Sequence, residues 1–278
     1  MDFFQLNDGA RIPRIGFGTY KMTDPKQTVD AVEEALRVGY THIDTAAVYA
    51  NEEYVGQAVR RSGIPREQLY LTSKVWNTDR GYDTTLRACE ASLKRLGTDW
   101  LDLYLIHWPA AAHQFPDDWM KINAETWRAL ERLKEEGMVR SIGLSNFMPH
   151  HIEPLLAAAN IAPAVDQIEF HPGYMQRECL EWCQAHGLLV EAWSPLGRGR
   201  VLSDPLLLSL AEKYGVTVAQ VCLGWVLAHG VLPLPKSVTP ERILENTTPA
   251  NLSAADVQAV DAMPLTGWSG HTPDTVAF

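Results

Sequence analysis

The sequence predicts an α/β fold of the (β/α)8 barrel class, in which parallel strands alternate with helices. Short apolar runs rich in β-branched residues recur along the 278 residues of the chain. Amphipathic helical stretches separate these runs, and such alternation builds βαβ units with a parallel sheet. With a short first strand around residues 14–20 there are eight strands. Eight such units fit a TIM barrel of this length.

The chain opens with two extended runs on either side of Asn7-Asp8-Gly9. An Asp-Gly pair between extended runs is a strong signal for a β-hairpin, because these residues tolerate the positive φ angles of its turn. We therefore expect an N-terminal β-hairpin that closes the bottom of the barrel.

The predicted strands follow one another at regular intervals. They lie at residues 14–20, 40–46, 69–75, 101–107, 139–145, 164–170, 188–194 and 231–235. Residues 28–39 have the apolar spacing of a helix, with Val29, Val32 and Leu36 on one face. Residues 124–137 repeat this pattern and end on Gly137, a helix stop signal.

No linker or low-complexity tract marks a domain boundary, so residues 1–278 are expected to form a single domain. The alternative architecture is a doubly wound sheet. When it binds a dinucleotide, that fold usually carries GxGxxG after its first strand. The nearest string here, GFGTYK at 16–21, lacks the third glycine, which favours the barrel.

The composition describes a globular protein with a formal net charge of −10. This charge argues against general binding to nucleic acid or to an anionic membrane. The N-terminus has no basic and apolar signal-peptide pattern, and no run reaches the ~18 apolar residues of a membrane helix. We expect a cytoplasmic protein.

The four cysteines form no CxxC pair. Cys179 and Cys183 are expected to share one face of a helix, but no partner at zinc-site spacing lies near them in the sequence. We expect buried or half-buried free thiols and no metal.

Polar residues follow the predicted strands at their carboxyl ends, where barrel enzymes place their active sites. Asp44, Lys74 and His107 end three successive strands, and Tyr49 lies in the loop after Asp44. A single residue of this kind is commonly a cap, a packed ring or a core histidine. Four of them at one barrel mouth indicate a catalytic site.

These four side chains suit proton donation to a carbonyl oxygen. A buried Lys74 needs a carboxylate partner, and Asp44 on the adjacent strand is the natural candidate. The Lys74 ammonium favours the phenolate and would lower the pKa of Tyr49. Tyr49 would then donate a proton to a developing alkoxide while His107 orients the carbonyl. The set lacks a hydride donor, which only a cofactor supplies.

The later strand ends offer a place for such a cofactor. Trp193 is expected to stack on a nicotinamide ring, with Asn146 and Gln167 bonded to its carboxamide. Residues 235–246 then bring together Lys236, Ser237 and Arg242 beside a helix start. Barrels commonly bind phosphate after their last two strands, and helix N-termini favour anions.

Taken together, these segments resemble the aldo-keto reductase family over nearly the whole chain. The motifs are HIDTAAVYANEEYVG (42–56), LTSKVW (71–76), LDLYLIHWP (101–109), IGLSNF (142–147), DQIEFHPGYMQ (166–176), EAWSPLG (191–197) and PKSVTPERILEN (235–246).

The resemblance implies roles for individual residues. The catalytic residues would be Asp44, Tyr49, Lys74 and His107. The cofactor-binding residues would be Thr19, Asp44, Ser145, Asn146, Gln167, Trp193, Ser194, Leu196, Lys236, Ser237, Val238, Arg242, Glu245 and Asn246. The substrate-binding residues would be Tyr20, Trp76, His107 and Trp108.

The same resemblance implies NADPH as cofactor and the reduction of aldehydes or ketones to alcohols. Keto-sugars, keto-esters and small or aromatic aldehydes are the substrates expected. A short segment after Pro109 and a short tail after Met263 are similar to the bacterial members that include 2,5-diketo-D-gluconate reductase. We expect a monomer that acts on small carbonyl compounds.

Two alternatives remain at this point. The chain could be a cofactor-binding regulatory protein with little turnover, since a fold does not dictate a function. It could also be a lyase that uses Lys74 as a Schiff base. That reaction needs a depressed lysine pKa, which a nearby Asp44 would oppose.

Overall fold

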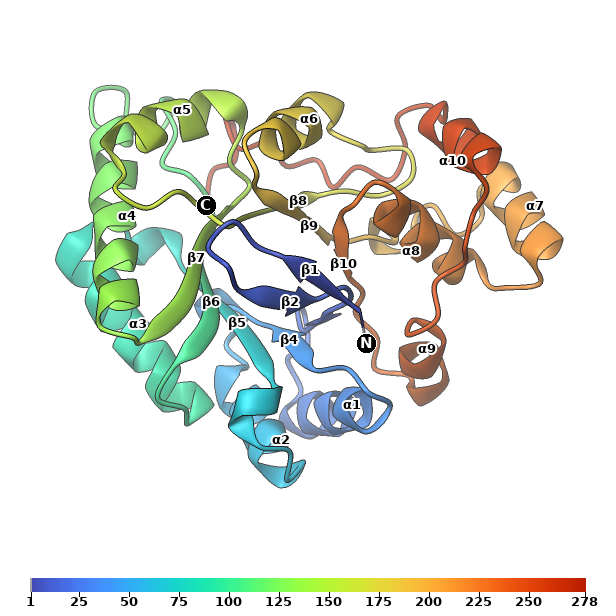
Figure 1. The fold of residues 1–278 in the computed structure, drawn as a ribbon, viewed down its shortest axis with the longest axis horizontal. Helices are drawn as coiled ribbons and strands as arrows, with labels where there is room; N and C mark the ends of the chain where they lie inside the picture. Colours follow the sequence, from blue (N-terminus) through green and yellow to red (C-terminus); the bar gives the residue numbers. More distant parts are fainter. Residues whose placement is uncertain (1) are drawn as a thin grey trace.

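The barrel is the centre of the structure, a computed structural model that describes residues 2–278. Eight strands form one parallel sheet in the order β10-β9-β8-β7-β6-β5-β4-β3. Two backbone hydrogen bonds join the first and last strands, from Gly16 N to Pro233 O (3.1 Å) and from Gly18 N to Pro235 O (3.0 Å). These bonds close the sheet, and the helices lie outside it (Figure 1). The predicted (β/α)8 barrel is confirmed, and the doubly wound alternative is wrong.

The barrel strands are β3 (Phe17–Gly18), β4 (His42–Asp44), β5 (Tyr70–Val75), β6 (Leu101–Ile106), β7 (Val139–Ser145), β8 (Val165–Glu169), β9 (Leu189–Trp193) and β10 (Leu232–Leu234). The α-helices are α1 (Pro25–Arg37), α2 (Glu52–Arg61), α3 (Tyr82–Leu96), α4 (Trp119–Glu135), α5 (Pro149–Ala158), α6 (Arg177–Ala185), α7 (Pro205–Tyr214), α8 (Val218–Ala228), α9 (Pro240–Glu245) and α10 (Ala254–Asp261).

Helix α1 begins three residues before the predicted segment. The reason is its cap: Asp24 accepts a hydrogen bond from Gln27 N (2.7 Å), and Pro25 occupies the first turn. An aspartate cap followed by proline is a strong helix start, because the aspartate accepts from an unpaired N–H of the first turn and proline has no N–H there to leave unpaired.

Close approach inside the barrel explains one glycine of the first strand region. A Cβ on Gly16 would lie 2.5 Å from the His42 ring and from the Leu234 side chain. Any larger residue would push these neighbours apart, so glycine is required where β3 meets β10.

The N-terminal hairpin joins β1 (Phe3–Gln5) and β2 (Arg11–Pro13) in antiparallel register. Gly9 adopts φ of 89° in the turn, as the Asp-Gly signal predicted. Ile12 is fully buried in an apolar cluster with residues near the starts of the barrel strands, Tyr70 and Val165 among them. The hairpin lies in front of the barrel in Figure 1. The hairpin prediction is therefore confirmed.

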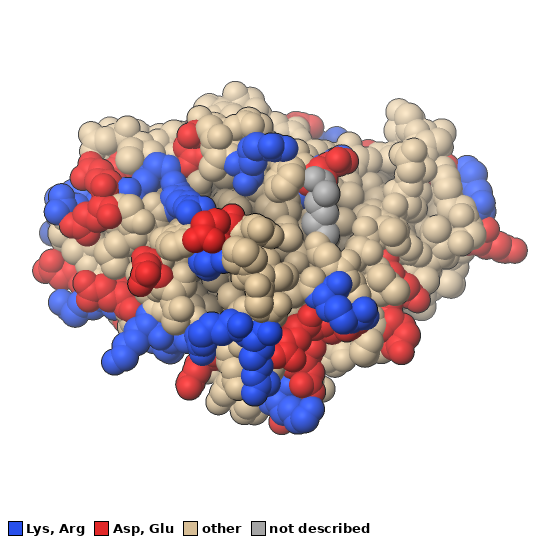
Figure 2. All heavy atoms as spheres, turned by 60° about the horizontal axis from the view of Figure 1, so that its bottom comes forward, with Lys and Arg blue, Asp and Glu red and all other residues tan. Residues whose placement is uncertain are grey.

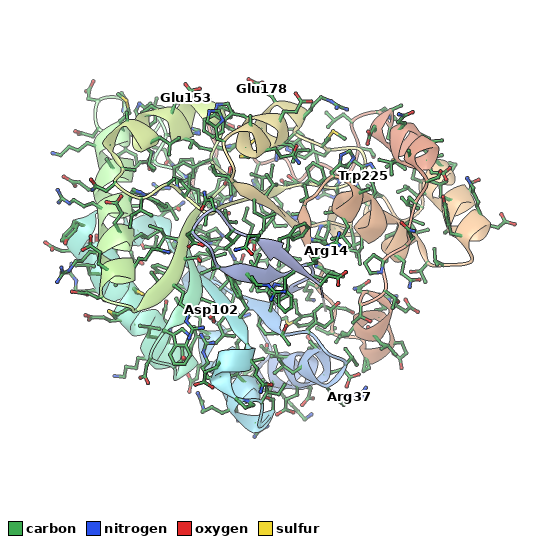
Figure 3. All side chains as sticks on the ribbon, in the orientation of Figure 1. Arg14, Arg37, Asp102, Glu153, Glu178 and Trp225 are labelled. Atoms are coloured by element: carbon green, nitrogen blue, oxygen red, sulfur yellow. The ribbon has the colours of Figure 1, made fainter. Side chains whose placement is uncertain are left out.

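Two labelled side chains in Figure 3 show how the helical shell is attached. Trp225 of α8 stacks on Phe170 with ring centroids 4.9 Å apart, and its Nε1 donates to Asp261 Oδ1 (2.8 Å). Asp102, near the start of β6, forms an ion pair with Arg66 (2.7 Å). These two contacts each pair a polar group that the fold buries, which offsets the cost of removing it from water.

Acidic and basic side chains are interspersed on the face drawn in Figure 2. Within residues 2–278, no single helix combines the length and hydropathy that would cross a membrane. Helices α7 and α8 together meet those two criteria, but they are bent by 93°.

The four cysteines are free and buried, as expected from the sequence. One partner was missed: Asp166 Oδ2 lies 3.9 Å from Cys179 Sγ and 4.0 Å from Cys183 Sγ. Asp166 is on β8, outside the sequence range of α6, so spacing along the chain could not reveal it. Burial raises the pKa of Asp166 to about 8.

Candidate active site

A single cleft of about 1010 Å³ opens at the carboxyl ends of the barrel strands. Its floor includes Asp44, Tyr49 and His107, and the same cleft continues to Lys236 and Arg242 beyond β10. The catalytic and phosphate-binding candidates therefore line one continuous space.

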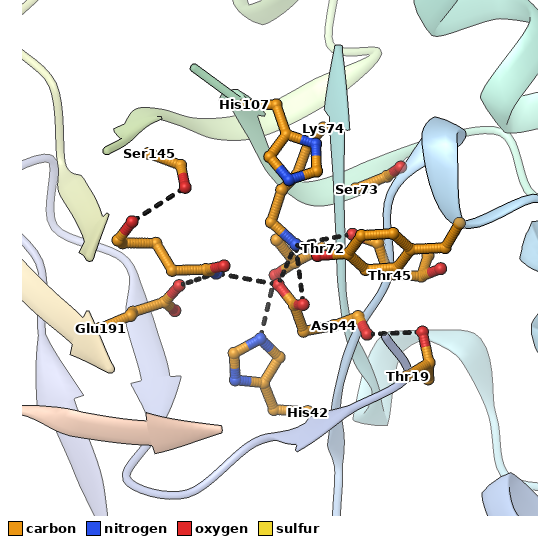
Figure 4. Close-up of polar contacts among 12 residues, drawn as sticks. Thr19, His42, Asp44, Thr45, Thr72, Ser73, Lys74, His107, Ser145 and Glu191 are labelled. Carbon is orange, nitrogen blue, oxygen red and sulfur yellow. Dashed lines mark hydrogen bonds and ion pairs between the residues drawn. The ribbon is translucent and has the colours of Figure 1, made fainter. Parts of the chain in front are cut away.

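Lys74 is the centre of the polar cluster below this cleft (Figure 4). It is fully buried, and its Nζ donates to Asp44 Oδ1 (2.7 Å) and Oδ2 (2.9 Å), and to Thr45 O (2.9 Å). A fourth, longer contact joins Nζ to Tyr49 Oη at 3.4 Å. Strands β4 and β5 are neighbours, so their inward-facing residues meet at this edge.

The pKa values in this cluster follow from burial and charge. Burial lowers the pKa of Lys74, but the Asp44 carboxylate outweighs it, and the net pKa is raised. Lys74 is therefore a stable cation. Burial raises the pKa of Tyr49 to about 12, and Lys74 lowers it while Asp44 raises it. The expected lowering by Lys74 is present, but burial dominates, so the phenol keeps its proton at neutral pH.

His107 lies beside Tyr49, just beyond the end of β6. It is 7% exposed, and its ring meets the Tyr49 ring edge to face with centroids 5.6 Å apart. Burial, with the charges of Lys74 and Arg80, holds the pKa of His107 well below its usual range. A neutral imidazole has one N–H donor, which suits it to bond a carbonyl oxygen.

Asn146 fixes the Trp193 ring on the other side of the cleft. Its Oδ1 accepts from Trp193 Nε1 (2.8 Å), while its Nδ2 donates to His107 O (2.9 Å) and Ser145 Oγ (3.0 Å). Both N–H groups of the amide are thus used within the protein, while Oδ1 accepts one bond and can accept a second. Asn146 positions Trp193, and only a bond that its Nδ2 donates to a carboxamide would need one of these contacts to open.

Gln167 has a different set of partners. Its Nε2 donates to Asp44 Oδ2 (2.9 Å) and to Glu191 Oε2 (2.7 Å). Gln167 also lines the cleft. It therefore connects the Asp44–Lys74 pair to a further buried carboxyl group, Glu191, which begins the EAWSPLG motif but received no role in the sequence analysis.

Several residues around the cleft adopt positive φ although they are not glycine. Lys21, Asn146, Ser194 and Arg198 all line it, and Ala50 follows Tyr49. Such conformations cost of order 1–3 kcal/mol each and gather at functional sites. Their concentration here supports a site selected for geometry rather than for stability.

The far end of the cleft is built by the turn between β10 and α9 and by the start of α8. Lys236, Ser237 and Arg242 line it, as predicted, and burial lowers the pKa of Lys236. Thr217 and Val218 at the start of α8 line it too. Two cations and a helix N-terminus form a favourable environment for a phosphate group.

Aromatic rings form the wall beside the catalytic floor. Trp76 meets the His107 ring at 5.1 Å, and Phe278 stacks on Trp76 at 5.7 Å. Phe278 also meets Trp108 at 5.3 Å, and Tyr20 meets Tyr49 at 5.1 Å. The C-terminal segment thus completes the wall.

Most of the predicted residues share this cleft. Its lining includes Tyr20, Asp44, Tyr49, Trp76, His107, Trp108, Ser145, Asn146, Gln167, Trp193, Ser194, Leu196, Lys236, Ser237, Arg242, Glu245 and Asn246. Three predicted residues do not line it. Lys74 lies beneath the floor, Thr19 is buried with its hydroxyl donating to Asp44 O (3.0 Å), and Val238 lines a separate groove beside α1.

Sequence reasoning missed several lining residues, among them Lys21, Arg198, His271 and Phe278. Arg198 could have been found, because GRGR follows a predicted strand end. Its guanidinium lies over the Trp193 ring, 5.5 Å from the centroid. The tail residues carried no local signal, because only the path of the chain brings them back to the cleft.

Comparisons with known proteins agree with this geometry. Residues 14–264 match the sequence model of the Aldo/keto reductase family. Glyoxal reductase of Bacillus subtilis (strain 168) is 46% identical over 279 residues, covering 100% of this chain and 98% of that protein. The 9,11-endoperoxide prostaglandin H2 reductase of Trypanosoma cruzi is 41% identical, covering 97% and 94%. The crystal structure of a Gox0644 variant in complex with NADPH superimposes with a TM-score of 0.90 at 41% identity, covering 100% and 99%.

Proposed function

The chain belongs to the aldo/keto reductase family, and from this premise we propose that Tyr49 is its proton donor in NADPH-dependent carbonyl reduction. The observation that carries the proposal is the buried cluster at the cleft floor. The Lys74 ammonium donates hydrogen bonds to Asp44 and to the Tyr49 hydroxyl, and the His107 ring lies beside the phenol.

The residues of the cleft fit NADPH. The dinucleotide needs a flat surface for its nicotinamide ring, an amide partner for its carboxamide and cations for its phosphates. Trp193 offers the surface, Gln167 offers an amide, and Lys236 with Arg242 offers the charge, all along one cleft. Bound there, NADPH supplies the hydride that no side chain can provide.

The protein's own part in the reaction is to bind the carbonyl and move one proton. His107, neutral at physiological pH, donates a hydrogen bond to the carbonyl oxygen. Tyr49 donates its proton to that oxygen as negative charge develops on it. Lys74 stabilises the phenolate that remains, and Asp44 keeps Lys74 charged and in place.

The substrates are proposed to be small carbonyl compounds: keto-sugars, keto-esters, and small or aromatic aldehydes. The aromatic wall of Trp76, Trp108 and Phe278 favours substrates with an apolar or planar part. The name of the Bacillus relative, glyoxal reductase, supports including small dicarbonyl compounds in the first substrate panel.

Tyr49→Phe is the decisive test. The variant keeps the ring packing but lacks the donor, so we expect NADPH binding within about three-fold of wild type. Because one general acid contributes typically 10²–10⁴-fold, turnover should fall at least about 100-fold. NADPH oxidation at 340 nm with methylglyoxal, a β-keto ester, a keto-sugar acid and nitrobenzaldehyde measures the rate, and tryptophan fluorescence quenching measures binding.

Tyr104→Phe is the matched control, because Tyr104 on β6 is a buried tyrosine outside the cleft lining, and its hydroxyl has no hydrogen-bond partner among residues 2–278. It should retain most of the activity. A Tyr49→Phe enzyme with a substantial fraction of the wild-type rate would contradict the proposed proton donor. Tight NADPH binding by wild type without turnover of any carbonyl would instead favour a cofactor-sensing protein.

The lyase alternative loses support in this geometry. A Schiff base needs a neutral amine with a free lone pair. Lys74 Nζ is held by both oxygens of Asp44 and by Thr45 O, and its pKa is raised.

A further inference from the structure

Glu191 is a buried carboxyl group with no part in the mechanism above. It lies on β9, is fully buried, and is paired in register with Gln167 of β8. Its Oε2 accepts from Gln167 Nε2 at 2.7 Å, while its Oε1 has no hydrogen-bond partner among residues 2–278. Burying a carboxyl oxygen without a partner costs free energy, so stability alone does not explain why a glutamate occupies this position.

The two carboxyl groups dictate which way the Gln167 amide points. Nε2 has two N–H groups, and one bonds Asp44 while the other bonds Glu191. A flipped amide would place its oxygen against Asp44 Oδ2, where two oxygens would repel. Both donors are therefore used inside the barrel, and the amide oxygen remains for the cleft that Gln167 lines.

We propose that Glu191 is a positioning residue of this enzyme, which acts through Gln167 and adds a titratable charge beneath the nicotinamide end of the cleft. The inference rests on the proposed function, because Gln167 is taken as the partner of the cofactor's carboxamide. One N–H of the Gln167 amide is held by Asp44 and the other by Glu191. The two hydrogen bonds together fix the plane of the amide group.

The charge of Glu191 depends on its surroundings in the barrel interior. Asp44 from β4, and Lys74 and Tyr70 from β5, are the charged or titratable groups that influence it or are influenced by it. Strand β10 contributes the apolar Leu232 opposite it. Burial, then the Asp44 charge, raises the pKa of Glu191 to about 8. Glu191 is thus neutral in slightly acidic solution and ionised in alkaline solution.

This titration has a consequence for the cofactor's two oxidation states. The oxidised nicotinamide ring carries a positive charge and the reduced ring does not. An ionised Glu191 therefore favours NADP+ over NADPH. The ratio Kd(NADP+)/Kd(NADPH) should fall at least three-fold between pH 6.5 and pH 9. The 2′-phosphate is common to both forms, so its own titration largely cancels in the ratio.

Two variants separate charge from position. Glu191→Gln keeps the size and an oxygen acceptor for Gln167 but removes the ionisation, so its ratio should stay constant across this pH range. Glu191→Leu removes the acceptor as well, so binding of both cofactor forms should weaken three- to ten-fold. Quenching of tryptophan fluorescence, titrated at pH 6.5, 7.5 and 9, measures every dissociation constant.

Glu131→Gln is the matched control. Glu131 is also buried, but it lies on α4, where it accepts from Asn160 N (2.6 Å) and Ile161 N (2.8 Å) away from the cleft. This variant should show the pH-dependent ratio of wild type. An identical pH dependence in wild type and Glu191→Gln would overturn the proposal, even if Glu191→Leu failed to fold. Because the ratio is an equilibrium measurement, it stands apart from turnover: a wild type that binds both forms but reduces no carbonyl would contradict only the proposed function.

Discussion

Arg242 is a single side chain that should decide which dinucleotide is preferred. It lies in the part of the cleft that also contains Lys236 and Ser237, beside the start of α9. The 2′-phosphate is the one group that NADPH has and NADH lacks. A guanidinium recognises phosphate with paired, charge-assisted bonds, which are stronger than neutral ones.

We therefore expect Arg242→Ala to weaken NADPH binding by about 10- to 100-fold, the equivalent of ~1.5–3 kcal/mol for a charged hydrogen bond. NADH binding should change less than three-fold. Fluorescence titration with each dinucleotide measures both effects. Equal weakening of NADPH and NADH binding would show that Arg242 does not recognise the 2′-phosphate.

The residue scale also shows how far side-chain chemistry can be read from a sequence. Lys74 in an apolar strand required a buried carboxylate, and Asp44 proved to be its partner at 2.7 Å. Glu191 sits in an equally buried strand, but its partner Gln167 is itself neutral. A buried acid does not require an amide as its partner in the way that a buried ammonium requires a carboxylate. The sequence therefore gave no reason to pair Glu191 with Gln167.

At the scale of elements, the hairpin packs against the end of the barrel away from the cleft, so we expect it to contribute to stability and not to catalysis. Ile12 of β2 is fully buried in the apolar cluster at the amino ends of the strands, and Asn7 Nδ2 donates to Pro163 O (2.8 Å). The cleft with the candidate catalytic residues lies at the opposite ends of the same strands. The two ends of the barrel should therefore respond separately to mutation.

Ile12→Ala removes buried methyl groups and should lower the free energy of unfolding by about 2–5 kcal/mol. At temperatures where the variant is folded, kcat/KM should stay within about two-fold of wild type. Chemical denaturation and steady-state kinetics check the two parts. Phe3→Ala, an exposed position on the same hairpin, should cost much less stability. A loss of kcat/KM in folded Ile12→Ala would show that the two barrel ends are coupled.

Element boundaries were predictable where local chemistry sets them. The turn at Gly9 is an example, because the residues that make it are neighbours in the chain. The cap at Asp24 is equally local, but the apolar spacing alone placed the start of α1 three residues too late. The wall formed by Phe278 and Trp76 was not predictable, since the path of the C-terminal segment depends on the surface it crosses. His113 and Gln114 hold that segment through Val276 O.

At the scale of the whole molecule, we propose that residues 1–278 unfold as one domain. The described chain closes through contacts between its first and last strands, so neither half completes the barrel alone. Thermal unfolding followed by far-ultraviolet circular dichroism and by tryptophan fluorescence should give coincident transitions. Saturating NADPH should raise the midpoints from both probes by the same amount, because a ligand that binds only the native state stabilises the whole cooperative unit that unfolds. Two separated transitions would contradict a single domain.

The pH dependence of stability offers a second test of the whole molecule. Burial raises the pKa of Asp166 from 3.8 to about 8, so the folded state holds a proton that the unfolded state releases. The stability this contributes is fully present below pH 3.8 and is lost as pH rises through 8. Asp166→Asn mimics the protonated acid without this loss.

The variant should therefore gain stability relative to wild type as pH rises from 5 to 8, by more than ~1.4 kcal/mol, the equivalent of one pKa unit. Urea denaturation at pH 5, 6.5 and 8 measures the difference. Glu131→Gln controls for the loss of a buried carboxyl group elsewhere. A constant difference between Asp166→Asn and wild type would mean that Asp166 is ionised in the folded protein throughout.

The sequence by itself determined the barrel, its hairpin and the catalytic candidates, because apolar periodicity, turn residues and strand-end positions are local properties. Only the tertiary structure decided which side chains meet across the barrel. Gln167 donates a hydrogen bond to Asp44, although the two residues are 123 positions apart in the sequence. Asp166 of β8 contacts the two cysteine thiols of α6. Such contacts depend on the closure and curvature of the whole sheet, which no single segment contains.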